Sequence, residues 1–505
     1  MSFLLGLDVG TTGCKAVIFD SEGNIKGYGF QEYEILYPGA QWAEQDASSV
    51  WETVKKVLKM AIYEAGIEEI KAIGVSVQGD AIIPVDKNIT PLRPAILGMD
   101  YRSLEEAREC ADLFGDRKLF EMTGMKPHPI NSLTKILWVK KNEKDIYSKT
   151  YKFMTYGDFI LTKLGADPAD PVIDSTMASR TMAFDIQKRE WSREILEKVD
   201  VDIDLLSRPV PSGRMLGKIH PDLYRELGIS KETAIATGGH DQVCAAIGSG
   251  CIEEGMGLDS HGTAEVLSTT LKGPLLNSIM FESFYPCYLH GVDDAYFTFA
   301  LLHIGGILLK WYRDNFAYAE VVEAKLQGED PYNIITRKLR EEPSSVFVLP
   351  HFNGSGTPWC DLESKGAILG LNMSTTRNDI AKAIMDSLTY ELRINIERMK
   401  EAGIKIREIR TVGGGAKSPL WLKIKANILG FPIHTLKVRE AACLGAAILA
   451  GKGTGEFSTV EQGVDASVRI DKEYLPDDKL QGRYEDRYKI YKSIYEILKP
   501  LNHMI

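Results

Sequence analysis

The sequence predicts an α/β fold with two domains, and three observations support this. The chain has 505 residues, which is more than one hydrophobic core normally supports. An amphipathic helical pattern at 46–65 is followed by a buried-strand pattern at 70–77, as in α/β proteins. Gly-Leu-Asp followed by a Gly-Thr turn occurs near the start and again at 257–263. This short repeat suggests two related halves that face each other across a cleft.

Composition excludes several classes of protein. The 60 basic and 70 acidic residues give a net charge of −10, and no long basic run is present, so we expect no nucleic-acid partner. The N-terminus lacks a basic signal-peptide region, and the most apolar later run, 299–311, is broken by His303 and Gly305, so we expect no membrane span. The seven cysteines are scattered without C-x-x-C pairing, which predicts free thiols and a cytoplasmic protein.

The rest of the chain is organised around the stretch 4–20. Two apolar, β-branched runs flank the sequence Gly-Thr-Thr-Gly at 10–13, which predicts a β-hairpin. Asp8 at the end of the first strand offers an oxygen to a metal ion, beside backbone N–H groups that can hold phosphate. A tight hairpin with an acid near its tip is the other interpretation of so short a motif.

Two groups of polar residues follow predicted strands in the first half. The strand at 70–77 ends at Gln78 and Asp80, at the carboxyl end where open α/β sheets bind ligands; a solvated loop acid is the alternative for Asp80. A short apolar strand at 95–99 precedes Asp100 and Arg102, which share one face of an extended segment. These two residues form either a local ion pair or a pair that grips the hydroxyls of a polyol.

A further strand at 234–237 leads into two glycines and then His240-Asp241-Gln242 at the start of a helix of small residues. The glycines allow a ligand to approach closely, and a helix N-terminus favours an anion. Asp241 is therefore either a simple helix cap or a base that accepts a hydroxyl proton during phosphoryl transfer.

The second half has its own signals. The clearest helix in the sequence is predicted at 376–402, with a capping box formed by Thr376 and Asp379. The strand at 409–412 runs into three glycines, 413–415, which let the backbone lie flat against a planar ligand or a phosphate; a flexible turn is the alternative. Helices are predicted at 419–429 and 441–451.

Taken together, these motifs resemble the FGGY family of carbohydrate kinases, within the actin-like and ribonuclease-H-like ATPase superfamily, over essentially the whole chain. The resemblance is carried by Asp8-x-Gly10-Thr11-Thr12, Asp100-x-Arg102, Gly239-His240-Asp241-Gln242, Gly262-Thr263, Gly305-Gly306 with Trp311, Gly413-Gly414-Gly415-Ala416 and Leu444-Gly445-Ala446-Ala447. It implies two ribonuclease-H-like (actin-like ATPase) domains flanking a central catalytic cleft. Residues 1–250 would hold the sugar and the catalytic base, and residues 251–505 most of the nucleotide.

The resemblance implies an ATP- and Mg²⁺-dependent kinase that phosphorylates a hydroxyl of a small sugar, which is a ketose such as xylulose, a fuculose-like sugar, or a polyol. It makes Asp241 the catalytic base, places the metal at Asp8 and Asp241, and suggests a homodimer. The implied ATP-binding positions are Thr11, Thr12, Gly13, Lys15, Gly262, Thr263, Gly306, Lys310, Gly414 and Gly415. The implied sugar-binding positions are Gln78, Asp80, Asp100, Arg102, His240 and Gln242.

Departures from the family pattern leave the sugar open. Xylulose kinases usually carry Gln-Met-His-Gly where this chain has Gln78-Gly79-Asp80, and Gly98 stands where a Trp usually begins Trp-x-Asp-x-Arg. Two rival functions are an actin-like or chaperone-like ATPase without a sugar acceptor, and a sugar-sensing repressor. The first would not need the polar residues at the strand ends, and the second would carry a helix-turn-helix, which we do not expect before Leu4.

Overall fold

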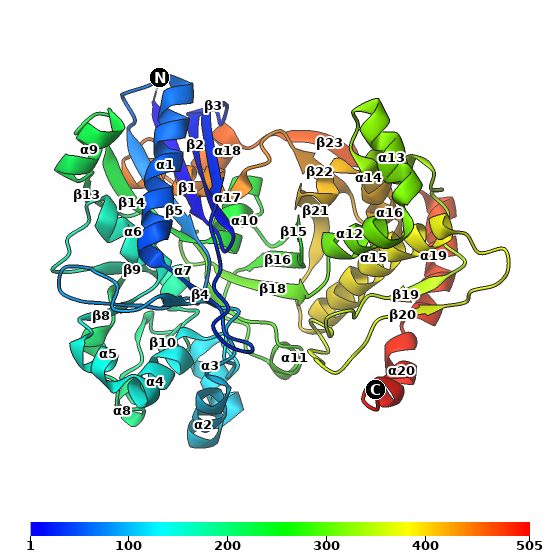
Figure 1. Cartoon of the computed structure of the whole chain (residues 1–505), viewed down its shortest axis with the longest axis horizontal. Helices are drawn as coiled ribbons and strands as arrows, with labels where there is room; N and C mark the ends of the chain where they lie inside the picture. Colours follow the sequence, from blue (N-terminus) through cyan, green and yellow to red (C-terminus); the bar gives the residue numbers. More distant parts are fainter. Residues whose placement is uncertain (1) are drawn as a thin grey trace.

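The computed structural model describes residues 2–505 and shows two α/β domains beside each other (Figure 1). The first domain contains a six-stranded sheet and the second a seven-stranded sheet. The first sheet, in spatial order, is β13 (Met215–Lys218), β14 (Ala234–His240), β5 (Ala72–Val77), β1 (Phe3–Val9), β2 (Gly13–Asp20) and β3 (Ile25–Glu32). The second is β17 (Tyr288–Leu289), β18 (Tyr296–Leu302), β16 (Glu265–Leu271), β15 (Gly255–His261), β21 (Ile406–Gly413), β22 (Ile433–Leu436) and β23 (Ile470–Tyr474).

The two sheets share one pairing pattern. Strand β1 pairs antiparallel with β2 and parallel with β5, and β15 pairs in the same way with β16 and β21. Outward from these central strands, the next pairs also match in direction: β2 with β3 and β16 with β18 are antiparallel, whereas β5 with β14 and β21 with β22 are parallel. The prediction of two related halves is confirmed by this repetition, and each half carries a tight hairpin at the same place in its sheet.

Helices cover both sheets, and five two-stranded sheets complete the fold. The helices in the first half of the chain are α1 (Ala47–Ala65), α2 (Leu104–Phe114), α3 (Asp116–Thr123), α4 (Ser132–Asn142), α5 (Lys144–Lys149), α6 (Tyr156–Leu164), α7 (Ser175–Ala178), α8 (Arg193–Lys198), α9 (Pro221–Leu227) and α10 (Asp241–Ser249). Those in the second half are α11 (Ser278–Glu282), α12 (Gly306–Phe316), α13 (Tyr318–Gln327), α14 (Pro331–Arg337), α15 (Arg377–Glu401), α16 (Pro419–Leu429), α17 (Ala441–Gly453), α18 (Val460–Ser467), α19 (Asp478–Tyr491) and α20 (Ile494–Asn502). The small sheets pair β4 (Glu44–Gln45) with β7 (Ala95–Ile96), β6 (Ile83–Val85) with β8 (Lys152–Met154), β9 (Val172–Asp174) with β12 (Arg208–Val210), β10 (Phe184–Asp185) with β11 (Glu190–Trp191), and β19 (Phe347–Leu349) with β20 (Ala367–Leu369).

The predicted helix boundaries follow from local chemistry. Helix α1 begins after Asp46, whose side chain accepts a hydrogen bond from the Ser48 N–H, and ends at Gly66 in the left-handed conformation. Helix α15 begins at the predicted capping box of Thr376 and Asp379. The expected strand at 95–99 is shorter, because only Ala95 and Ile96 pair with a neighbour, and the chain then bends toward Asp100.

Helix α17 comes from the second half of the chain but packs against β1, β5 and β14 of the first sheet and against α10. Figure 1 shows α17 and α18 lying with the first domain. Residues 251–505 therefore supply the second sheet and also one covering layer of the first domain. The strands on either side of residue 250 belong to different sheets.

Glycines permit this packing. A Cβ atom at Gly445 of α17 would lie 1.8 Å from the carbonyl oxygen of Cys244 in α10, and one at Gly6 of β1 would lie 1.8 Å from the carbonyl oxygen of Cys443. Because real Cβ atoms do not approach other atoms so closely, the backbones touch only where side chains are absent.

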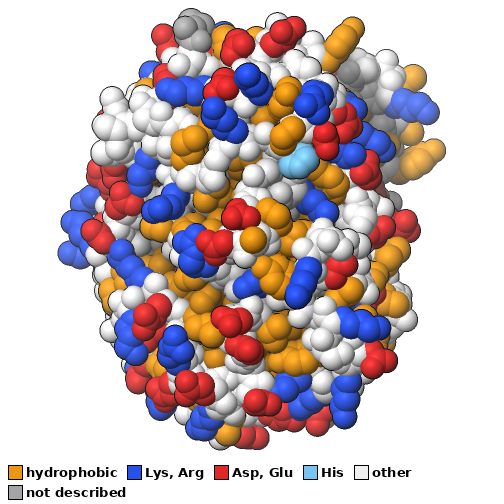
Figure 2. Space-filling view, turned by 90° about the vertical axis from the view of Figure 1, so that its left-hand side faces the viewer, with side chains coloured by type: hydrophobic (Ala, Val, Ile, Leu, Met, Phe, Trp, Pro, Cys, Tyr) orange, Lys and Arg blue, Asp and Glu red, His pale blue; other side chains and the backbone are white. Residues whose placement is uncertain are grey.

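On the outer face of the first domain, Figure 2 shows basic and acidic side chains interspersed, with apolar side chains between them. Within residues 2–505, no helix combines the length and the apolar character needed to cross a membrane.

The glycine contact yields a stability prediction. We expect Gly445→Ala to lower the free energy of unfolding by about 1–3 kcal/mol, because the new methyl group must push α17 away from α10. The matched control is Gly482→Ala in α19, where an added Cβ meets no atom within 4 Å; this change should stabilise the protein by about 0.5–1 kcal/mol. Urea unfolding of both variants measures the difference, and equal effects would contradict the packing argument.

Candidate active site

Three parallel strands bring the predicted polar residues to one edge of the first sheet. Strands β1, β5 and β14 run in the same direction, so their carboxyl ends lie together, which is where open α/β sheets bind ligands. These ends carry Asp8, Gln78 and His240, and Asp241 follows as the first residue of α10.

The Asp241 carboxyl is held by its neighbours. Its Oδ1 accepts the backbone N–H of Gln242 at 2.6 Å and lies 3.2 Å from Nε2 of His240. Burial, followed by the nearby charge of Asp8, raises the pKa of Asp241 to about 7. This carboxyl therefore changes protonation state near neutral pH, as a general base must.

His240 is neutral, because burial and then the charge of Arg180 lower its pKa well below the ordinary value. A neutral ring that donates from Nε2 to the Asp241 carboxylate has an acceptor at Nδ1, and the Tyr288 hydroxyl lies 3.2 Å from that atom. The chain Tyr288–His240–Asp241 thus fixes the orientation of the carboxylate.

Asp8 is the second acid of the site. Its Oδ1 accepts a hydrogen bond from the Ser76 hydroxyl at 2.7 Å, and burial raises its pKa. Lys15 lies opposite Asp8 in the hairpin register, and its Nζ bonds to Glu440 Oε2 at 2.7 Å. Lys15 is therefore paired with a residue that directly precedes α17.

Asp80 forms a buried ion pair with Arg180 through two contacts, of which the Arg180 Nε to Asp80 Oδ1 distance is 3.1 Å. The guanidinium lies 5.2 Å from the ring centre of Tyr288. A Cβ at Gly79 would lie 2.8 Å from His240 Nε2 and 3.0 Å from Arg180 Nε, so residue 79 must be glycine for these groups to meet. Asp80 is thus no solvated loop acid.

Arg180 and Tyr288 were not identified from the sequence. Arg180 follows the short helix α7, and Tyr288 lies in the two-residue strand β17; neither belongs to a motif or to a long periodic element.

Asp100 and Arg102 form the local ion pair that the sequence allowed. Arg102 Nη2 lies 2.8 Å from Asp100 Oδ2, and the guanidinium stacks 3.9 Å from the ring centre of Trp42. Both side chains are fully buried, and Arg102 Nη1 also reaches Glu44 at 2.7 Å. Their contact with a sugar stays a prediction.

Gln78 supports the first hairpin. Its Nε2 donates to the carbonyl oxygen of Gly10 at 3.2 Å, and Gln45 donates to that of Thr11 at 3.0 Å. These bonds fix the turn that contains Thr11, Thr12 and Gly13.

The second hairpin opens onto a cavity of about 260 Å³ in the second domain. Four of the predicted ATP-binding positions line it, from three separate segments: Gly262, Gly306, Gly414 and Gly415. Tyr332, Asn333 and Trp421 also line it, and sequence reasoning did not select them. Lys310 lies exposed on α12 and is not part of this lining.

The raised pKa of Asp241 predicts a pH-dependent stability. Well below pH 4 the carboxyl is protonated in both the folded and the unfolded protein, whereas above pH 7 the folded protein must hold a partly buried, ionised group beside Asp8. We expect Asp241→Asn to raise the melting temperature at pH 8, with a gain that declines toward pH 4. Thermal unfolding across this pH range measures the difference in melting temperature. The exposed-acid control Asp112→Asn in α2 should show no dependence of this difference on pH. A difference for Asp241→Asn that stays constant across the pH range would contradict the prediction.

Comparison with known proteins agrees with this geometry. Residues 3–248 match the N-terminal domain of the FGGY family of carbohydrate kinases, and residues 259–453 match its C-terminal domain. The chain is 30% identical over 503 residues to a xylulose kinase of Staphylococcus epidermidis, covering 99% of this chain and 97% of that protein. It is also 30% identical over 508 residues to glycerol kinase 2 of Thermotoga maritima, with 98% and 97% covered.

Among solved structures, the fold resembles ligand-bound xylulose kinase from Lactobacillus acidophilus, with a TM-score of 0.88, 22% identity and 99% of both chains covered. This similarity shows the shared fold, which is a pair of actin-like ATPase domains. The family match spans both halves, and the chain therefore belongs to the FGGY family of carbohydrate kinases and is an ATP-dependent phosphotransferase acting on a sugar or polyol.

Proposed function

We propose that Asp241 is the base of this kinase and accepts the proton of the sugar hydroxyl that attacks the terminal phosphoryl group of ATP. One observation carries the proposal: the Asp241 carboxylate lies at the strand edge that also holds Asp8 and the Asp80–Arg180 pair, where burial and the charge of Asp8 raise its pKa to about 7. Its ionised form can take up a proton at neutral pH.

The acceptor sugar would bind on the Arg180 side of Asp241. Arg180 Nη1 and Gln242 Oε1 are buried and have no hydrogen-bond partner within residues 2–505. A donor and an acceptor left open in this way suit a hydroxyl group, which can both accept and donate. Asp80, His240 and the predicted pair Asp100 and Arg102 would complete the sugar side.

ATP would bind between the two hairpins, with its phosphates at the Gly10–Gly13 and Gly262–Thr263 turns and its adenosine in the cavity lined by Gly306, Gly414 and Gly415. Lys15 would exchange its bond with Glu440 for one with a phosphate oxygen. Lys310 would contact the nucleotide from the rim.

The residues present fit Mg²⁺. Asp8 and Asp241 are carboxylates, the ligand type that Mg²⁺ prefers, and burial followed by the charge of Asp8 raises the pKa of Asp241, so a cation bound by these acids would be stabilised. When bound, Mg²⁺ supplies charge neutralisation for the phosphates. The metal roles of Asp8 and Asp241 rest on this chemistry.

For the substrate, we infer a small ketose or polyol. The relatives named above are a xylulose kinase and a glycerol kinase. Gly79 leaves no room for the larger side chains found there in xylulose kinases, since a Cβ alone would contact His240 and Arg180. We also infer a cytoplasmic homodimer; the seven cysteines are free thiols, which suits a reducing compartment.

A panel of candidate acceptors tests the inferred substrate class. Ketoses, aldoses and polyols of three to seven carbons are added with Mg-ATP, and ADP release is measured. We expect one ketose or polyol to increase the rate well above the rate without sugar. ADP release that no acceptor increases would favour the ATPase without a sugar acceptor.

The role of Asp241 has a separate test with that sugar. Asp241→Ala should lower kcat by roughly 10²–10⁴-fold, because the proton has no acceptor, and should leave the affinity for ATP, measured by calorimetry without Mg²⁺, within about threefold. In the unmodified enzyme, kcat/KM for the sugar should fall as the pH decreases through about 7, since protonation removes the base. An active Asp241→Ala variant, or a rate independent of pH between 5 and 8, would remove Asp241 from this role.

A further inference from the structure

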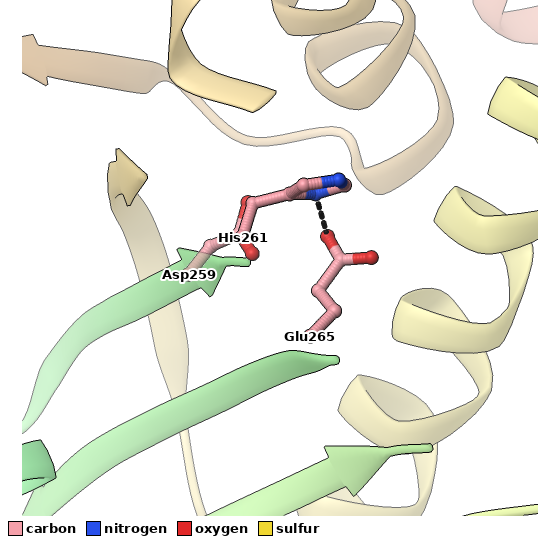
Figure 3. Close-up of side chains that lie close together, drawn as sticks. All are labelled: Asp259, His261 and Glu265. Carbon is pink, nitrogen blue, oxygen red and sulfur yellow. Dashed lines mark hydrogen bonds and ion pairs between the residues drawn. The ribbon is translucent and has the colours of Figure 1, made fainter. Parts of the chain in front are cut away.

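A buried lysine lies behind the second hairpin, where it is surrounded by two acids and a histidine. Lys425 of α16 bonds to Asp259 of β15, and its Nζ lies 2.5 Å from Glu265 Oε1 and 3.1 Å from His261 Nδ1. Figure 3 shows Asp259, His261 and Glu265 directed toward one another at the ends of their strands, with the His261–Glu265 bond of 2.7 Å across the turn. These four side chains, which we call the Lys425 cluster, are at most 1% exposed.

The acids and the histidine of this cluster have the composition of a metal site. One potential ligand atom from each of Asp259, His261 and Glu265 lies within 4.8 Å of the others. The ammonium group of Lys425, however, already contacts all three. The cluster therefore contains its own cation in the place where an ion would bind.

The charges of the cluster depend on one another. Burial opposes ionisation of Glu265, but His261 and Lys425 outweigh it and lower the pKa of Glu265 to about 2. Burial raises the pKa of Asp259 to about 6 despite Lys425. Loss of the ammonium would leave these acids uncompensated in a dry interior, which is strongly unfavourable.

His261 connects the Lys425 cluster to the glycine turns that line the proposed nucleotide cavity. Its carbonyl oxygen accepts the Gly414 N–H at 2.9 Å, and its ring lies under Gly415, where a Cβ would be 2.5 Å from Cγ. The ring also packs edge-on against Trp421, with centroids 4.3 Å apart. One side of the cavity thus rests on this imidazole.

The neighbouring turn is tied in by backbone bonds. Gly262, the next residue, accepts the Gly306 N–H at 2.9 Å, and Thr263 accepts the Gly305 N–H at 2.9 Å. A shift of His261 would therefore move the turns at 262–263, 305–306 and 413–415 relative to one another.

We propose that Lys425 is a positioning residue for ATP, an internal cation that holds His261 and thereby sets the spacing of the three glycine turns around the nucleotide. It contacts no substrate. The inference rests on the proposed placement of ATP in this cavity. It predicts an effect on ATP that does not extend to the sugar, whose proposed contacts lie in the other domain.

The test replaces Lys425 by Met, which keeps the length of the side chain and removes its charge. We expect the KM for ATP to rise roughly ten- to a hundredfold, because a small displacement of binding groups is costly, while the KM for the sugar stays within about twofold. The matched control is Lys423→Met on the same helix, where the ammonium pairs with Glu341 at the surface at a distance of 2.6 Å. This control should change neither constant.

If Lys425→Met does not fold, Lys425→Gln serves in its place: its amide can donate a hydrogen bond to a neighbouring acid but carries no positive charge. It should also raise the KM for ATP selectively. An unchanged KM for ATP in the folded variant, or equal increases for ATP and sugar, overturns the proposal.

A third variant separates this inference from the placement of ATP on which it rests. Gly414→Val introduces a side chain at the cavity wall, where an added Cβ is 3.9 Å from its nearest neighbour, the His261 carbonyl oxygen. Loss of ATP binding in Gly414→Val together with normal ATP binding in Lys425→Met would overturn only the positioning role. Normal ATP binding in Gly414→Val would overturn the placement of ATP, and the inference with it.

Discussion

The structure depends on the direct backbone contact between α17 and the first domain. Glycines at positions 6, 74, 248 and 445 bring α17 against β1, β5 and α10 at distances that no side chain allows. Because α17 follows β22 of the second sheet, this contact fixes the second domain against the first. The strand ends of the first domain, which carry the proposed sugar side, and the hairpin of β15 and β16, which carries part of the proposed ATP side, are thereby held in a fixed relation, as a reaction between molecules bound to different domains requires.

At the carboxyl ends of the first-domain strands, the proposed chemistry depends on charges that the fold holds close together. Burial and the like charge of Asp8 raise the pKa of Asp241, whose side chain is 33% exposed and has no cation partner in the part of the chain that the structure describes. By contrast, Asp80, Asp100 and the acids of the Lys425 cluster are each matched with a cation. Acids that are paired with a cation stabilise the fold, whereas acids without a cation partner are the candidates for the reaction.

Much of the fold could be predicted because its signals are local. The hairpin at 4–20, the capped helices α1 and α15 and the strand that ends at Gln78 follow from side-chain periodicity, glycine turns and capping residues. The short repeat at 257–263 correctly indicated a second half, although its identical strand pairing became visible only in the sheets. The return of α17 to the first domain was not predicted, since helix patterns do not show which sheet a helix covers.

Part of the candidate site could be proposed from the sequence for the same reason. Asp8, Asp241 and the glycine turns lie in compact motifs. Arg180, Tyr288 and Lys425 instead contact residues that are far away in the sequence. Lys425 in particular resembles an ordinary surface lysine, because its helix also carries the exposed Lys423. Only the folded chain distinguishes a lysine that faces solvent from one enclosed by Asp259, His261 and Glu265.

The glycine-lined contact of α17 also limits how this chain can vary. At positions 6, 74, 248 and 445 any side chain at all is too large, including the methyl group of alanine. A saturation survey scored for lost activity would therefore place these four positions among the most intolerant in the chain, although none of them reaches a substrate. Intolerance to substitution alone would therefore not distinguish these packing contacts from a reaction centre.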